Sequence, residues 1–165
     1  MKKIILTLIS MLVATIAYTQ QLPIEIINNS SQDIDIFITA YGDNPFNSGE
    51  CDSCTTPVET DVFTLDSMDS INLEFFDDVP SGIKWWGYSC DTVPPFLGGP
   101  GCVGSVAESL CGDPVWVMIG FNYPGIGTER IGDTSCGLSD NYSQGSFTAT
   151  WTVVGGTDII VVFDD

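Results

Sequence analysis

Several short segments of the chain alternate strictly between apolar and polar side chains. In residues 33–40, the apolar side chains of Ile34, Ile36 and Ile38 share one face, and the carboxylate of Asp35 lies on the opposite face. A period of two is typical of an antiparallel strand that buries one face and exposes the other. The segment therefore predicts a strand at the surface of a hydrophobic core.

Similar short apolar or alternating segments, separated by turn residues, recur along the whole chain, and none of them has the period of a helix. The expected strands are residues 23–27, 33–40, 62–65, 71–76, 83–89, 115–123, 146–154 and 158–163. The third and fourth strands are expected to pair with each other. Gly155-Gly156 joins the last two strands and predicts a hairpin. Long stretches rich in Gly, Pro, Asn and Ser predict loops at 42–60, 90–113 and 132–145.

About eight short strands with Gly- and Pro-rich turns predict an all-β fold. We expect an antiparallel β-sandwich reinforced by disulfides, with a closed, barrel-like sandwich as the alternative. Residues 21–165 have the length of a single domain. Because charge discourages strand pairing between chains, Asp164 and Asp165 are expected to protect a sheet edge.

Residues 1–20 have the pattern of a secretory signal peptide. Lys2 and Lys3 precede an apolar run from Ile4 to Ala17, and cleavage is expected after Ala17 or Thr19. The run is shorter than the roughly 20 residues that span a bilayer. No cysteine follows it closely, so the acylated cysteine of a bacterial lipoprotein is not expected. The pattern predicts a secreted or periplasmic protein without a transmembrane segment.

In an exported protein, cysteines are expected to form disulfides. The cysteines are Cys51, Cys54, Cys90, Cys102, Cys111 and Cys136. Cys51 and Cys54 have the C-x-x-C spacing of redox proteins, but the residues that follow them favour a loop and a structural role. The sequence leaves the pairing open. Pairs that are close in sequence would join Cys51 to Cys54 and Cys90 to Cys111.

The charge and the missing residue types exclude several functions. The chain has 22 acidic and 4 basic residues, a formal net charge of −18, and no histidine. Such a surface repels nucleic acids and anionic membranes. Without histidine there is no Ser-His-Asp or Cys-His catalysis and no histidine metal site. We therefore expect no enzyme, although a small glycoside hydrolase that uses two carboxylates is an unfavoured alternative.

Two acidic stretches make calcium a candidate cofactor, because Ca²⁺ prefers oxygen ligands. Asp43, Asn47 and Glu50 lie in one predicted loop, and Asp77 and Asp78 lie in a predicted turn. Neither stretch has the spacing of an EF-hand. Asp and Asn also favour turns for backbone reasons alone, and this simpler explanation is preferred. A second simple explanation of the acidity is adaptation to salt, which screens surface charge.

An aromatic strand is the strongest candidate for a binding site. Trp85 and Trp86 are adjacent in the predicted strand 83–89, so their side chains point to opposite faces. One indole is expected in the core, and the other is expected at the surface near Tyr88 or Lys84. An exposed aromatic ring can stack on a sugar. The simpler alternative is that both indoles are covered, since Trp is well buried on average.

Together these features predict a secreted, non-catalytic, monomeric β-sandwich protein that binds an extracellular ligand, with carbohydrate or matrix favoured. Its partner would then be an extracellular polysaccharide or a surface component. The alternative is a structural, surface-associated or adhesive protein that depends on calcium.

Overall fold

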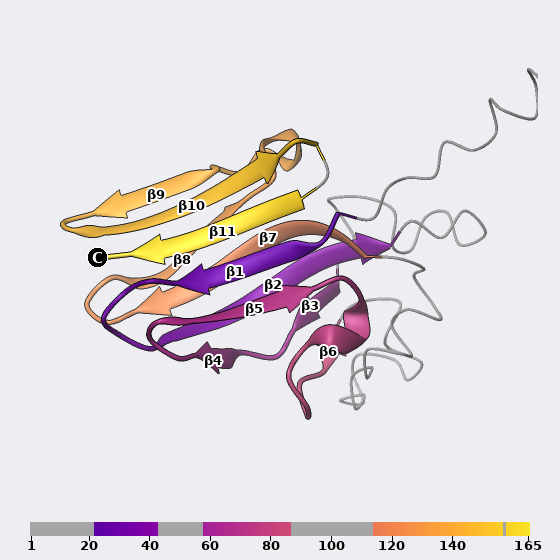
Figure 1. The fold of residues 1–165 in the computed structure, drawn as a ribbon, viewed down its shortest axis with the longest axis horizontal. Helices are drawn as coiled ribbons and strands as arrows, with labels where there is room; N and C mark the ends of the chain where they lie inside the picture. The colour runs from indigo at the N-terminus through magenta and orange to yellow at the C-terminus, as the bar shows by residue number, and fades with distance from the viewer. Residues whose placement is uncertain (1–21, 43–57, 87–113, 157) are drawn as a thin grey trace, which may run out of the picture.

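The computed structural model describes residues 22–42, 58–86, 114–156 and 158–165, which form two β-sheets (Figure 1). The first sheet has the strand order β5-β1-β11-β10-β9 and contains β1 (Ile24–Asn28), β5 (Asp69–Leu73), β9 (Asn141–Gln144), β10 (Phe147–Val154) and β11 (Asp158–Asp164). The second sheet has the order β6-β3-β2-β7-β8, with β4 also paired to β2. It contains β2 (Ile34–Gly42), β3 (Val58–Thr60), β4 (Phe63–Leu65), β6 (Trp85–Trp86), β7 (Pro114–Tyr123) and β8 (Gly127–Gly132).

The prediction of an all-β fold with two sheets is confirmed, and the described strands do not close into a barrel. The only helical segments among these residues are single 3₁₀ turns, η1 (Phe76–Asp78) and η3 (Thr134–Cys136). No helix in the described ranges is long and apolar enough to cross a bilayer. The predicted signal peptide, residues 1–20, lies outside the described residues.

One apolar core joins the two sheets, because the alternating strands place their apolar side chains between them. Ile34, Ile36 and Ile38 of β2 are fully buried, as their alternation predicts. Two groups of aromatic rings pack in this core. Phe121 packs edge-on against Phe163 with ring centroids 5.2 Å apart. The other group consists of Phe76, Trp85 and Trp116.

Three strands were not predicted. Strands β3 and β9 lie in predicted loops, and β8 lies between a predicted turn and a predicted loop. Gly, Thr, Glu and Arg make up most of β8, and β9 is the polar edge of the first sheet, so neither has an apolar alternation. The neighbouring strands, rather than local sequence, stabilise such segments. The described part of the chain therefore has eleven strands instead of about eight.

Three predicted pairing features are wrong. Strands β1 and β11 are parallel, with Ile24 opposite Ile159, so the fold is not purely antiparallel. Strands β4 and β5 do not pair, because β4 joins β2 in the second sheet and β5 joins β1 in the first. Asp164 and Asp165 do not protect an edge, since β11 lies between β1 and β10 (Figure 1). The predicted hairpin of β10 and β11 is confirmed.

The side chain of Asn28 links the β1–β2 and β4–β5 connections, where the chain first passes from one sheet to the other. Its side chain is fully buried at the end of β1. Its amide nitrogen donates to the carbonyl oxygens of Gln32, Leu65 and Asp66 at 2.9, 3.1 and 3.0 Å. Its amide oxygen accepts from the backbone nitrogen and the hydroxyl of Ser30 at 3.0 and 2.6 Å. One side chain thus satisfies polar groups of the β1–β2 and β4–β5 connections.

The carboxylate of Asp165 fastens the end of β11 to the rest of the domain. It accepts the backbone nitrogen of Ser31 at 3.0 Å, the hydroxyl of Ser31 at 2.7 Å and the hydroxyl of Tyr123 at 2.6 Å. The hydrogen bonds from Tyr123 and then from Ser31 lower the pKa of Asp165, because they favour the ionised carboxylate. The same bond to Asp165 raises the pKa of Tyr123.

Replacing Asn28 is expected to destabilise the domain strongly. Asn28→Ala leaves buried carbonyl groups without donors, so the free energy of unfolding should fall by about 3 kcal/mol in urea titrations. Asn28→Asp, which keeps the shape but loses the donors, should be at least as damaging. Asn29→Ala is the matched control, since the backbone nitrogen of Asn29 still donates to Phe163. Ordinary surface substitutions change the free energy of unfolding by roughly 0.5 kcal/mol or less. An Asn28→Ala protein whose free energy of unfolding lies within about that range of the control would contradict this role.

The Asp165 contacts predict a pH-dependent contribution to stability. Because the folded pKa of Asp165 is lowered, the contribution is fully present above the unfolded pKa of about 4 and is lost as the pH falls through the folded pKa. The melting temperature of the wild type should exceed that of Asp165→Asn at about pH 7, and the difference should vanish near about pH 2. Asp66→Asn, in an exposed turn, controls for net charge. A wild-type advantage that persists unchanged at the lowest pH would refute the assignment.

Candidate functional site

The two adjacent tryptophans lie on β6, an edge strand of the second sheet, and they face opposite ways. Trp85 points into the core and is fully buried. Its indole nitrogen donates to the carbonyl oxygen of Phe76 at 2.9 Å. Its ring also packs edge-on against the ring of Phe76, with centroids 4.7 Å apart. Trp85 therefore anchors the short strand to the core.

Trp86 is held at the surface by a carboxylate of the neighbouring strand connection. Its side chain is 40% exposed, and its indole nitrogen donates to Oδ1 of Asp61. Oδ2 of Asp61 accepts the backbone nitrogen of Lys84 at 3.2 Å, and the backbone nitrogen of Asp61 donates to the Lys84 carbonyl at 2.8 Å. The two bonds with the Lys84 backbone fix Asp61 beside the start of β6. Its carboxylate therefore holds the indole of Trp86 in a defined orientation.

A row of side chains crosses the outer face of the second sheet from Trp86. Glu59 of β3 is the register partner of both Trp86 and Thr39. We call Trp86, Glu59 and Thr39 the Trp86 row. Register partners in antiparallel strands share a face, with Cβ atoms about 5 Å apart. Glu59 is exposed, whereas Thr39 is 3% exposed and its hydroxyl has no hydrogen-bond partner among the described residues.

Next to the Trp86 row, part of this outer face is apolar and covered. Phe37 and Met118 form a second buried cluster there, and Leu138 packs against it. The ring of Phe37 lies across Gly120, where an added Cβ would meet the ring at 1.9 Å. The guanidinium of Arg130 lies 5.6 Å from the centre of the same ring. The Trp86 row therefore lies on one side of a closed apolar cluster, and on the other side the face is polar and exposed at Asp35, Asn122 and Thr128.

A hollow of about 360 Å³ lies in the segment that leads into β6. It is lined by Asp77, Val79, Pro80, Ser81, Gly82, Ile83 and Lys84. One oxygen of Asp78 accepts the backbone nitrogens of Glu74 and Phe75 at 2.7 and 2.8 Å. Asp78 thus has the backbone role that carboxylates commonly have in turns. The proposed calcium role of Asp77 and Asp78 stays a prediction.

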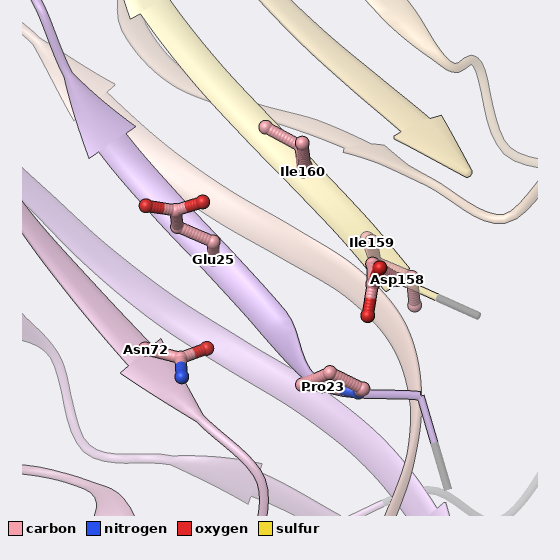
Figure 2. Close-up of a pocket in the computed structure, with 6 residues that line it drawn as sticks. All are labelled: Pro23, Glu25, Asn72, Asp158, Ile159 and Ile160. Carbon is pink, nitrogen blue, oxygen red and sulfur yellow. The ribbon is translucent and has the colours of Figure 1, made fainter. Parts of the chain in front are cut away.

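A second hollow, of about 330 Å³, lies on the first sheet where β1 and β11 begin side by side (Figure 2). Figure 2 shows the carboxylates of Glu25 and Asp158, the amide of Asn72 and the side chain of Ile160 around the hollow. Hydrogen-bonding groups beside an apolar side chain suit a small polar molecule. The hollow has no aromatic ring among its lining residues, so it offers no stacking surface.

The structure places only some of the predicted site residues. Asp43, Asn47, Glu50 and Tyr88 lie outside the described residues. So do five of the cysteines, Cys51, Cys54, Cys90, Cys102 and Cys111. Cys136 is described and is disulfide-bonded, but the pairing of the cysteines stays a prediction. Within the described ranges, no group of three or more acidic, cysteine or histidine side chains is arranged to hold a metal ion.

The sequence does not indicate Glu59, Thr39 or Asp61 as residues near Trp86. Glu59 and Thr39 reach Trp86 through strand pairing, and β3 falls in a stretch that was expected to be a loop. Asp61 follows β3 directly, and nothing in its local sequence indicates a bond to an indole. The available signal was the Val58-Glu59-Thr60 alternation, which is too short to distinguish a strand from a loop.

Comparison of the chain with models of protein families, with curated proteins and with solved structures finds no match in any of the three.

Removing the Asp61 carboxylate is expected to free the Trp86 ring. Asp61→Ala should lower the hetero-nuclear NOE of the Trp86 indole N–H, because the ring loses its hydrogen-bond acceptor. The free energy of unfolding should fall by about 1 kcal/mol, the typical net value of one hydrogen bond. The indole signal of the buried Trp85 is the internal control, since its acceptor is the Phe76 carbonyl. An unchanged Trp86 signal would show that Asp61 does not orient the ring.

Proposed function

We propose that this chain is a secreted, disulfide-reinforced β-sandwich protein that binds an extracellular carbohydrate without modifying it. The observation that carries the proposal is the exposed indole of Trp86, which the Asp61 carboxylate holds in a defined orientation. An aromatic face is large and apolar, and a rigid ring loses little conformational entropy when a ligand binds. Those properties suit stacking against the C–H face of a sugar ring.

The neighbouring groups of the row supply the polar part of such a site. The Glu59 carboxylate is an exposed hydrogen-bond acceptor on the same face as Trp86. Sugar hydroxyls are hydrogen-bond donors, and bonds to an ionised acceptor are stronger than neutral ones. A stacking ring beside an exposed carboxylate distinguishes this row from the hollow on the first sheet.

The alternative function, a calcium-dependent structural or adhesive protein, has less support from the described residues. Asp78 already accepts two backbone N–H groups within its own turn. The remaining residues of the calcium hypothesis, Asp43, Asn47 and Glu50, lie outside the described ranges. Carbohydrate binding is therefore the function we favour.

Replacing Trp86 is expected to abolish carbohydrate binding. The purified mature protein should be retarded in native gels that contain a suitable polysaccharide from a panel of neutral and charged polymers. Trp86→Ala should migrate as it does without polysaccharide, because loss of one stacking aromatic in a small site removes most of the affinity. Thermal melting would establish that the variant is folded.

The matched control is Phe75→Ala, because the side chain of Phe75 is also 40% exposed. Phe75 lies outside the Trp86 row, so this variant should be retarded like the wild type. The proposal fails if no polysaccharide in the panel retards the wild type. It also fails if Trp86→Ala is retarded as strongly as Phe75→Ala.

A further inference from the structure

The charges around Trp86 restrict the class of carbohydrate that the site can take. The register partner of Trp86 is the acidic residue Glu59, and the hydrogen-bond partner of its indole is the acidic residue Asp61. The whole chain carries 22 acidic residues against 4 basic ones, so the long-range field has the same sign as these neighbours. The basic residue of this segment is Lys84, two positions before Trp86, and the two carboxylates outweigh its single charge. A polysaccharide with carboxylate or sulfate groups would therefore be disfavoured at this edge.

A positively charged sugar finds two favourable partners in the same row. An ammonium group close to the face of an indole is attracted by the electrons of the ring. The Glu59 carboxylate stabilises the same charge, because Glu59 and Trp86 are register partners whose Cβ atoms lie about 5 Å apart. The rest of the sugar ring can stack on the indole, as in the proposed function.

Thr39 is the buried end of the same row. It lies next to Glu59 in the register, and its Oγ1 is buried with no hydrogen-bond partner among the described residues. Because this hydroxyl is buried, a sugar on the surface would meet Trp86 and Glu59, and the selectivity of the row comes from these two side chains.

We infer that the Trp86 row binds an amine-bearing polysaccharide, a polymer of unacetylated amino sugars, in preference to neutral or acidic polymers. This inference rests on the proposed function and adds the charge of the ligand to it. Trp86 contributes the stacking surface, and Glu59 contributes the negative charge that selects the ammonium group.

The test compares glucosamine hexamers with N-acetylglucosamine hexamers, in which acetylation removes the positive charge of every amine. Isothermal titration at about pH 5.5 should give roughly tenfold tighter binding of the glucosamine hexamer at low salt. The preference should shrink to about twofold in about 0.5 M NaCl, because salt screens exposed charges. Trp86→Ala should lose the binding of both oligomers.

Glu59→Gln is expected to remove the preference and to keep the weaker binding of the neutral oligomer. Asp66→Asn is the matched control, because Asp66 is an exposed residue outside the Trp86 row and its replacement also removes one negative charge. It should leave the preference unchanged. If Asp66→Asn weakens the preference as much as Glu59→Gln does, net charge rather than the Trp86 row selects the ligand, and the inference is wrong.

The failure of this inference can be distinguished from the failure of the proposed function. Equal affinities for the two hexamers, both lost in Trp86→Ala, would overturn the inference while supporting carbohydrate binding at Trp86. Binding of glucosamine hexamers that survives Trp86→Ala would overturn both, because the attraction would then be non-specific. Tighter binding of an acidic polymer, such as a polyuronate, would also overturn the inference.

Discussion

The fold depends on satisfying buried backbone groups where the chain passes between its two sheets, and Asn28 does this for two passages at once. The turns after β1 and after β4 lie side by side, and their carbonyl groups point toward the buried side chain of Asn28. A short side-chain amide has two N–H donors and a carbonyl acceptor. An ionised aspartate has no donor, and a serine hydroxyl has only one. Asp33 adds a second link, since its carboxylate accepts the backbone nitrogen of Ser67 at 2.9 Å.

The position of the candidate site also depends on the Asn28 contacts, because the segment after β5 leads through Phe76 to Trp85 and Trp86. Once β5 is paired with β1, the 3₁₀ turn η1 places Phe76 in the core. Phe76 then provides both the carbonyl and the ring against which Trp85 packs. Because adjacent strand residues face opposite ways, anchoring Trp85 inside the domain necessarily presents Trp86 outside it. The exposure of the second indole is thus a consequence of the core packing of the first.

The sequence pattern predicts the strands whose own residues alternate between apolar and polar side chains. It misses the strands that depend on pairing with neighbouring strands. The alternation of β2 and the Gly-Gly connection of β10 and β11 are visible without a structure. The parallel pairing of β1 with β11 joins the two ends of the described chain, and no local pattern records such a contact. The same distinction holds at the site. The opposite faces of Trp85 and Trp86 follow from a period of two, whereas Asp61 and Glu59 reach Trp86 only through the pairing of β3 with β6.

The role of each carboxylate in this protein follows from its position in the fold and not from the high total number of carboxylates. Asp78, Asp133 and Asp165 accept backbone N–H groups at turns or at the end of a strand, so part of the acidic composition has a structural role. Such residues explain why a strongly acidic chain need not hold a metal ion. Glu59 differs because it lies within a strand, on an outward face, opposite an exposed indole. A carboxylate in that position satisfies no turn, and it sets the electrostatic potential that a molecule stacked on Trp86 would meet.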